Sequence, residues 1–179
     1  MNKKLKDILS TSLYLLIVLF MTFLVVTYVG QRTKVAGASM EPMLKDGVNL
    51  IVDKISYRFS EPERFDIIVF PFRYAEKTYY IKRIIGMPGE TVYIDEEGNI
   101  FINGELLKEN YGKEVITDPG RAYEMITLGD DEYFVLGDNR NNSSDSRDPV
   151  VGNIHRDEFI GKAWMRIWPL SKMGIIKHQ

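Results

Sequence analysis

Ser39 is the residue with which this sequence could perform nucleophilic chemistry. It lies in the segment Val35–Leu44, between small residues on one side and Pro42 on the other. Small neighbours let another backbone approach the hydroxyl, and the proline fixes one φ angle. A serine hydroxyl is unreactive near neutral pH unless a base takes its proton. The chain must therefore supply a base from elsewhere, and Lys82 is the best candidate.

Lys82 lies in the segment Thr78–Gly89, where aromatic and β-branched residues run up to a Gly-Met-Pro-Gly stop. This pattern predicts a strand. Side chains alternate faces along a strand, so Lys82 shares a face with Tyr80 while Arg83 points the other way. A neutral amine near pH ~7.5 requires the pKa to fall by about 3 units, or roughly 4 kcal/mol, which full burial can supply. The alternative is a strand lysine whose ammonium reaches water.

Four segments together resemble bacterial type I signal peptidases, in the short single-span form typical of Gram-positive organisms. Ser39–Leu44 resembles the serine box of that family, and Arg64–Phe70 resembles the strand that follows it. Lys82–Glu90 resembles the lysine box, and Gly137–Arg147 the late box. All four occur in the family's order, and an apolar segment precedes them.

The resemblance implies a serine endopeptidase that removes signal peptides from exported preproteins after an Ala-x-Ala sequence. By this resemblance Ser39 is the nucleophile and Lys82 the general base, a Ser-Lys dyad that works through an acyl-enzyme. Ser143 would orient the lysine, and Asp145 and Arg147 would hold the geometry of the site. Asp145 and Arg147 lie two positions apart, a spacing that allows them to form an ion pair.

The resemblance also implies shallow apolar pockets for alanine-sized side chains. The matching positions are Val35, Met40, Leu44, Tyr80 and Ile81 around the residue before the cut, and Val69 for the residue two positions further back. The oxyanion donor would be the backbone N–H of Ser39. Gly37 stands where one branch of the family has a second donor, a serine hydroxyl, so that donor stays open. Phe65 stands where many members carry glycine.

The amino-terminal part of the chain predicts a membrane anchor. Three lysines fall within residues 1–7, and the following run, Ile8–Gln31, carries no charge. About 20 mostly apolar residues are enough to cross a bilayer. We expect residues 8–30 to span the membrane, with 1–7 cytoplasmic and 31–179 extracytoplasmic.

A cleaved signal peptide is the competing interpretation of this region, because Ala36–Ala38 has the form of an A-x-A cleavage site. The apolar run is longer than the ~7–15 residues of a signal peptide, which favours the anchor. A catalytic site so close to the anchor would lie near the bilayer. Met40, Met43, Trp164 and Trp168 could then form an apolar rim that faces lipid, or the tryptophans could be ordinary core.

The rest of the chain predicts a mostly β fold of short strands separated by turns. The expected strands are 48–52, 65–70, 78–85, 91–94, 99–102, 132–136 and 159–170. No convincing helix is expected after the anchor. The resemblance implies coiled antiparallel β-sheets of the signal peptidase and LexA type, with a small β insertion at about 89–128.

Composition excludes several other classes of protein. The chain has no cysteine, two histidines and a net charge of −2. A disulfide framework, a zinc site and a nucleic-acid partner are therefore not expected. A calcium loop in the late box fails because Arg140 would take a position that needs an oxygen ligand. We expect no cofactor or metal, a monomer, and two partners: preprotein signal peptides and the lipid bilayer.

Two other functions remain open. One is a self-cleaving repressor of the LexA kind, which needs an amino-terminal DNA-binding helix-turn-helix in place of this apolar run. The other is a non-catalytic membrane-anchored β-domain for binding or assembly. The presence of both Ser39 and Lys82 argues against the second.

Overall fold

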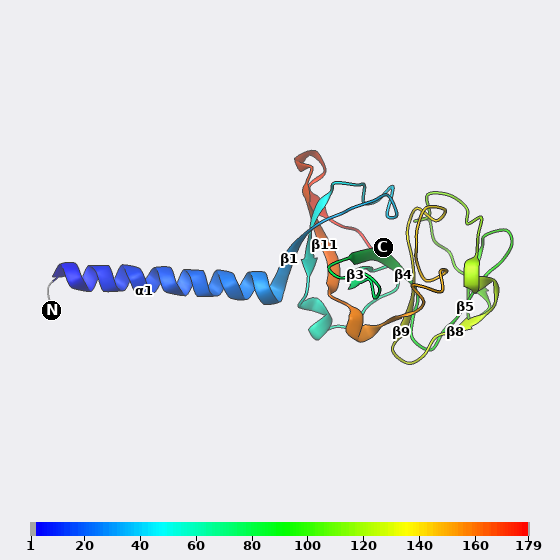
Figure 1. The fold of residues 1–179 in the computed structure, drawn as a ribbon, viewed down its shortest axis with the longest axis horizontal. Helices are drawn as coiled ribbons and strands as arrows, with labels where there is room; N and C mark the ends of the chain where they lie inside the picture. Colours follow the sequence, from blue (N-terminus) through cyan, green and yellow to red (C-terminus); the bar gives the residue numbers. More distant parts are fainter. Residues whose placement is uncertain (1–2, 179) are drawn as a thin grey trace.

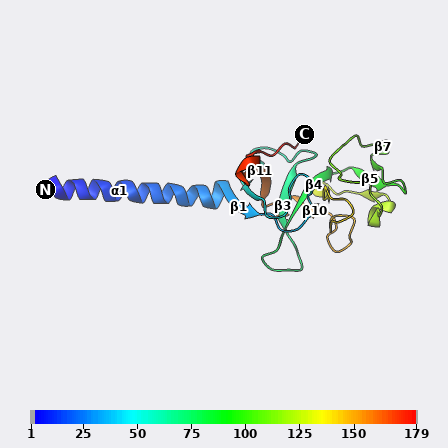
Figure 2. The same cartoon turned by 90° about the horizontal axis from the view of Figure 1, so that it is seen from above.

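The amino-terminal apolar run forms one long helix in the computed structural model, which describes residues 3–178. Helix α1 (Lys3–Leu24) continues into the π-helical turn η1 (Val25–Val29). Figures 1 and 2 both show it projecting away from the β-rich body. Within the described residues, Lys3–Val29 is the one helix long and apolar enough to cross a membrane. Residues 1–2 of the predicted cytoplasmic segment lie outside the described residues.

Eight strands form the larger of two sheets. They are β1 (Gly30–Lys34), β2 (Asn49–Asp53), β3 (Ile67–Pro71), β4 (Tyr79–Gly86), β9 (Glu132–Leu136), β10 (Ile154–His155), β11 (Gly161–Trp168) and β12 (Gly174–Ile175). The order is β1-β2-β11-β3-β4-β9-β10, with β12 paired to β11. Every pairing is antiparallel. The order differs from the chain order because β11 returns to lie between β2 and β3.

The smaller sheet comes from the chain between β4 and β9. Its strands are β5 (Thr91–Ile94), β6 (Ile100–Ile102), β7 (Glu105–Leu106) and β8 (Ile126–Thr127), in the order β7-β6-β5-β8. After η1, the described helical segments are short 3-10 turns: η2 (Ser56–Arg58), η3 (Gly120–Tyr123), η4 (Arg156–Glu158) and η5 (Leu170–Lys172). The predicted fold class, a mostly β protein with one amino-terminal apolar helix, is confirmed.

Gly86, at the end of β4, lets the small sheet pack closely against the large one. A Cβ at this position would lie 2.6 Å from Val92 Cγ2 and 2.8 Å from Leu128 Cδ1. Both side chains belong to the buried cluster that joins the two sheets. The close approach therefore needs a residue without a side chain at the point where β4 leaves the large sheet.

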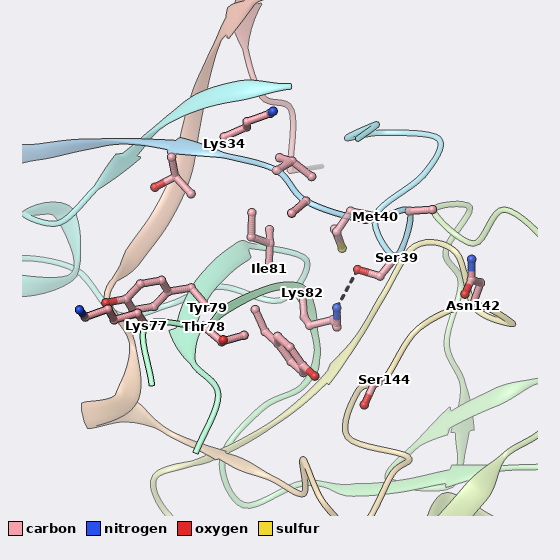
Figure 3. A pocket seen from close by; sticks show the side chains of 16 residues that line it. Lys34, Ser39, Met40, Lys77, Thr78, Tyr79, Ile81, Lys82, Asn142 and Ser144 are labelled. Carbon is pink, nitrogen blue, oxygen red and sulfur yellow. Dashed lines mark hydrogen bonds between the residues drawn. The ribbon is translucent and has the colours of Figure 1, made fainter. Parts of the chain in front are cut away.

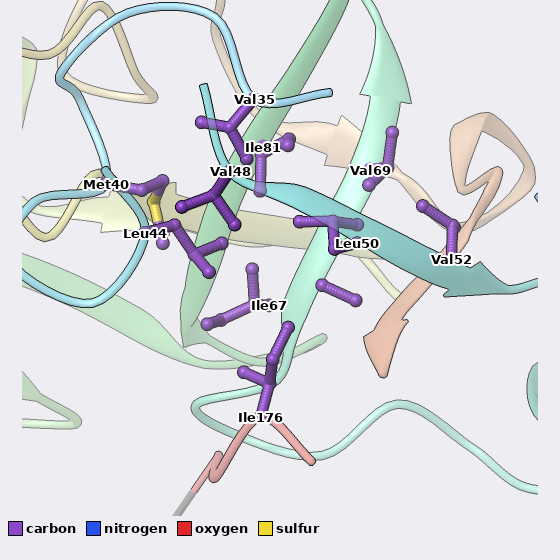
Figure 4. Close-up of a cluster of buried hydrophobic side chains, with 11 residues drawn as sticks. Val35, Met40, Leu44, Val48, Leu50, Val52, Ile67, Val69, Ile81 and Ile176 are labelled. Carbon is purple, nitrogen blue, oxygen red and sulfur yellow. The ribbon is translucent and has the colours of Figure 1, made fainter. Parts of the chain in front are cut away.

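A second buried cluster lies beneath the segment that carries Ser39 (Figure 4). It combines the β1–β2 connection with inward side chains of the large sheet: Val35, Met40, Leu44, Val48, Leu50, Val52, Ile67, Val69, Ile81, Ala163 and Ile176. Met40 is buried here, so its predicted place on a lipid-facing rim is wrong. Trp164 and Trp168 are exposed, so neither is ordinary core.

Phe65 has a backbone conformation that explains the glycine preferred at the matching position of the family it resembles. Its φ angle is 73°, in the left-handed region where a side chain is strained. Its N–H donates to the Ile84 carbonyl at 2.9 Å, and its ring packs on Tyr111 with centroids 4.9 Å apart. These contacts hold Phe65 in a conformation that glycine would adopt at less cost.

Candidate active site

Ser39 and Lys82 meet at one end of an open cleft (Figure 3). Ser39 lies on the connection between β1 and β2, and Lys82 lies in the middle of β4. The Lys82 Nζ atom is 2.8 Å from Ser39 Oγ and donates a hydrogen bond to it. The two residues are 43 positions apart in the sequence, so the contact depends on the folding of the loop over the sheet.

Lys82 is buried, with 3% of its surface exposed. Burial disfavours the charged ammonium and lowers the pKa of Lys82 to about 8, while the carboxylates of Asp145 and then Asp138 oppose this shift. The ring of Tyr80 lies 5.0 Å from Nζ, on the same face of the strand. The alternative of a lysine that reaches water is therefore wrong, because the amine is directed into the protein.

A residue of the late box holds the two backbone carbonyls on either side of Ser39, those of Ala38 and of Ser39 itself. The Asn139 N–H donates to the Ser39 carbonyl at 3.0 Å, and Asn139 Nδ2 donates to the Ala38 carbonyl at 3.1 Å. A Cβ at Gly137 would lie 2.5 Å from the same Ser39 oxygen and closer still to Ser143 Oγ. The segment that carries Ser39 therefore lies directly against the late box. Asn139 was not predicted as a site residue, although it lies inside the motif.

Asp145 and Arg147 form the predicted ion pair. Arg147 Nε donates to Asp145 Oδ1 at 2.8 Å, and Arg147 Nη2 donates to Oδ2 at 2.9 Å. The same carboxylate accepts the Gly137 N–H at 3.0 Å. Arg147 also donates to the carbonyls of Arg140 and Asp118. One buried pair thus fixes the two ends of the late box relative to each other.

Ser143 lies beside this assembly but does not contact Lys82 through a hydrogen bond. Its Oγ is buried and has no hydrogen-bond partner among the described residues. The residue lines a neighbouring cavity of about 750 Å³, which shares Asn142 and Ser144 with the cleft. The structure therefore brings Ser143 close to the Gly137 backbone, and not into contact with the lysine amine.

On the opposite face of β4, Arg83 forms a second buried ion pair that the sequence did not predict. Arg83 Nε and Nη2 donate to the two carboxylate oxygens of Asp138 at 2.8 and 2.7 Å. The Tyr111 ring covers the guanidinium, whose Cζ lies 3.9 Å from the ring centroid. This two-pronged contact anchors the start of the late box to the strand that carries Lys82.

The cleft beside the dyad has a volume of about 520 Å³. Residues 33–40, which run from the end of β1 into the turn that carries Ser39, line one side, and residues 77–82 line the other; Asn142 and Ser144 also line it. Four residues of the predicted pocket line it: Val35, Met40, Tyr80 and Ile81. Leu44 and Val69 do not line it; they belong, with Val35, Met40 and Ile81, to the buried cluster beneath the cleft.

The backbone at the mouth of this cleft carries an unused donor. In the described part of the chain, the Ser39 N–H has no hydrogen-bond acceptor. The Gly37 N–H is already engaged, because it donates to Asp46 Oδ1 at 2.9 Å. Gly37 also has a φ angle of 91°, where a side chain would be strained. One free backbone donor therefore lies next to the serine hydroxyl.

A serine hydroxyl against a buried lysine amine, at the end of a cleft, is the arrangement expected of a serine hydrolase that uses a lysine as its base. Comparison with known proteins identifies the family. The family model for signal peptidase, peptidase S26, matches residues 8–168. The chain belongs to this family and is a serine endopeptidase that removes signal peptides.

Two relatives agree with the family match. A probable signal peptidase I-2 of Synechocystis is 41% identical over 155 residues, covering 84% of this chain and 68% of the relative. Signal peptidase I P of Bacillus subtilis subsp. natto is 33% identical over 179 residues, covering 96% and 95%. A solved signal peptidase I from Enterococcus faecalis is 33% identical, with a TM-score of 0.46 over 57% of this chain and 97% of that one.

Proposed function

We propose that Ser39 is the nucleophile and Lys82 the general base of a membrane-anchored signal peptidase that cuts preproteins after small residues. The observation that carries this assignment is the 2.8 Å contact between Ser39 Oγ and the Lys82 amine. The pKa of that amine, lowered to about 8, leaves roughly a quarter of the molecules with a neutral base near pH ~7.5. An exposed lysine would leave far fewer.

The chemistry proceeds in two halves. Neutral Lys82 takes the hydroxyl proton while Ser39 Oγ attacks the scissile carbonyl. The oxyanion that forms accepts a hydrogen bond from the Ser39 N–H. The tetrahedral intermediate then collapses, and Lys82 gives its proton to the leaving amine, which becomes the new amino terminus of the mature protein. The signal peptide stays behind as an ester of Ser39. Lys82 next deprotonates a water molecule, which hydrolyses the ester and restores the free serine.

Substrate choice follows from the shape of the cleft. Strand β1 reaches one side of it and the first residues of β4 line the other, so a peptide can lie between these two strands as an added strand. Val35, Met40, Tyr80 and Ile81 form the apolar walls. Leu44 and Val69 fill the space beneath them, which keeps the pockets shallow. Such walls favour an alanine-sized residue before the cut and another two positions earlier.

Ser143, Asp145 and Arg147 have supporting roles in this proposal. Asp145 accepts a hydrogen bond from Gly137 and pairs with Arg147, so it holds the loop against which Ser39 lies. Ser143 Oγ is buried, lacks a partner among the described residues, and lies beside the Gly137 backbone. A rotation of this hydroxyl on substrate binding would allow it to orient the Lys82 amine.

The proposed topology is a single span with the catalytic part outside. Residues 8–30 cross the bilayer, residues 1–7 stay in the cytoplasm, and 31–179 form an extracytoplasmic domain with an insertion at about 89–128. The lysines within residues 1–7 favour this orientation. Strand β1 begins at Gly30, immediately after the apolar helix. The cleft therefore lies close to the surface where a signal peptide leaves the bilayer. We propose that the enzyme acts as a monomer.

One assay tests the chemical assignment. Detergent-solubilised full chain is mixed with a precursor whose signal peptide ends in Ala-x-Ala, and the new amino terminus is measured by mass. We expect Ser39→Ala and Lys82→Ala each to abolish cleavage while the circular dichroism spectrum is unchanged. Lys82→Arg should fail as well, because a guanidinium cannot act as a base.

Lys108→Ala is the matched control, because Lys108 is exposed and outside the cleft. It should cleave at the parent rate. Appreciable activity in Lys82→Arg would refute lysine as the base. A folded parent protein that never cleaves the precursor would favour a binding or assembly module instead.

A further inference from the structure

A cationic cavity lies on the other side of the nucleophile loop from the substrate cleft. It has a volume of about 330 Å³, and Met43, Lys45, Asp46, Arg166, Trp168 and Lys172 are among its lining residues. Three of these side chains are cationic and one is anionic. The anionic one, Asp46, already accepts the Gly37 N–H at 2.9 Å. The cavity therefore has an excess of positive charge.

Arg166 has hydrogen-bond donors to spare in this cavity. Its Nη2 atom donates to the Met43 carbonyl at 2.8 Å. Its Nε atom is buried and has no partner among the described residues. Arginine is well suited to oxyanions such as phosphate because its guanidinium carries five donors in a rigid fork. An anionic group that entered the cavity would find unused donors as well as charge.

The cavity opens beside an exposed apolar hairpin, which consists of the end of β11, β12 and residues 169–173 between them. Four side chains of this hairpin are at least half exposed: Trp168 at 53%, Leu170 at 67%, Met173 at 61% and Ile175 at 66%. Figures 1 and 2 both show this red segment on the side of the body from which the helix leaves. Tryptophan and other apolar side chains around a cationic site match a membrane interface, where acyl chains adjoin phosphate groups.

We propose that this cavity binds the phosphate headgroup of an anionic phospholipid, with the hairpin tip dipping into the bilayer beside it. Lys45, Arg166 and Lys172 contact the headgroup, and the exposed hairpin side chains contact the acyl chains. A soluble phosphate ester would meet the same cations but would gain nothing from the hairpin. The inference depends on the proposed membrane anchoring and does not depend on the peptidase chemistry.

Tryptophan quenching tests the proposal on the full chain. The sequence has two tryptophans, so a Trp164→Phe parent leaves Trp168, which lines the cavity, as the only reporter. The protein is reconstituted into vesicles of equal parts phosphatidylglycerol and phosphatidylcholine, with bromine near the headgroup on one lipid or the other. Random contact gives equal quenching by the two brominated lipids. We expect brominated phosphatidylglycerol to quench more strongly.

Two substitutions locate the effect. Lys45→Gln and Lys172→Gln remove charge from exposed side chains, and each should lower the preference for phosphatidylglycerol about fivefold. Lys108→Gln makes the same change on an exposed lysine outside the cavity and should leave the preference intact. Equal quenching in the parent would overturn the proposal. An equal loss in Lys108→Gln would overturn it too, because it would indicate general surface charge.

Soluble glycerol phosphate separates the two sources of the same anion. We expect it to leave the preference unchanged when added in excess to the vesicles. If it abolishes the preference, the cavity binds free phosphate esters and the lipid assignment is wrong. Vesicle flotation separates this proposal from the anchor. If the protein floats with the vesicles but shows no lipid preference, only the headgroup site is refuted. If it does not float, the headgroup site and the membrane anchor are both refuted.

Discussion

The buried lysine should make the protein less stable than it could be, and replacing Lys82 by methionine should reveal the cost. Methionine has a similar length and carries no charge. Burial lowers the pKa of Lys82 from 10.5 to about 8. Each unit corresponds to about 1.4 kcal/mol, so a charged Lys82 costs the folded state about 3 kcal/mol. We therefore expect the methionine variant to be more stable by about that amount below pH ~8.

The effect must depend on pH with a fixed sign. The folded pKa lies below the unfolded one, so the unfolded chain holds the proton more tightly between about pH 8 and 10.5. The stability of the lysine protein then rises with pH across this window, and the cost disappears above it. The advantage of methionine should shrink from about 3 kcal/mol near pH ~6.5 to about 1.5 kcal/mol near pH ~9.5.

Urea unfolding of the full chain in detergent measures this difference. Trp164 and Trp168 both lie in β11, so their fluorescence reports on the large sheet. Both proteins carry Ser39→Ala, which prevents self-cleavage and leaves the burial and carboxylates that shift the Lys82 pKa in place. Lys108→Met is the control and should show no pH-dependent gain. The reasoning is refuted if the advantage of methionine is the same at both pH values, or if lysine is the more stable near pH ~6.5.

Three further outcomes are expected. First, the value of kcat/KM should rise with pH to a plateau with a midpoint near pH ~8, because only neutral Lys82 can take the serine proton. A midpoint below pH ~7 in the rate profile would contradict this. Second, Gly137→Ala should lower kcat/KM about 100-fold, because the added methyl group would lie 2.5 Å from the Ser39 carbonyl oxygen. Gly174→Ala is the control and should keep the parent kcat/KM, because its methyl group would meet nothing within 4 Å. His155→Gln should keep parent activity in the same assay, since His155 Nδ1 contacts Asp131 at 3.2 Å on the surface; a large loss would revive a histidine base.

The position of Lys82 on the same face as Tyr80 and opposite Arg83 could be predicted because it depends on one local rule, the alternation of side chains along a strand. Strands β5 and β9 were also predicted with their observed bounds, since both consist of apolar and aromatic runs ended by turn residues. Strand β1 was missed. Its sequence, Gly30–Lys34, has little β propensity, and it forms a strand because five residues pair with β2.

Contacts between distant loops could not be predicted in the same way. Asn139 holds the Ala38 carbonyl across 101 positions of sequence, and no local pattern indicates such a partner. Leu44 and Val69 were expected in the substrate pocket because their positions match the family. Whether such an apolar side chain lines a cleft or lies beneath it depends on a small rotation of the backbone. In this chain both point into the core.

Two buried arginines pair with the carboxylates that oppose the low pKa of Lys82, a pKa that burial lowers. Asp145 and Asp138 are the carboxylates that oppose the effect of burial and raise the lysine pKa. Each of these carboxylates has an arginine in direct contact. Arg147 lies 2.8 and 2.9 Å from the two oxygens of Asp145, and Arg83 Nη2 lies 2.7 Å from Asp138 Oδ2. A carboxylate that is already neutralised attracts the ammonium less, so the lysine gains less by staying charged. Strand β4 thus carries two neighbouring basic residues, Lys82 and Arg83, in different electrostatic surroundings. Arg83 is buried against Asp138, and Lys82 can lose its proton because burial lowers its pKa by more than Asp145 and Asp138 raise it.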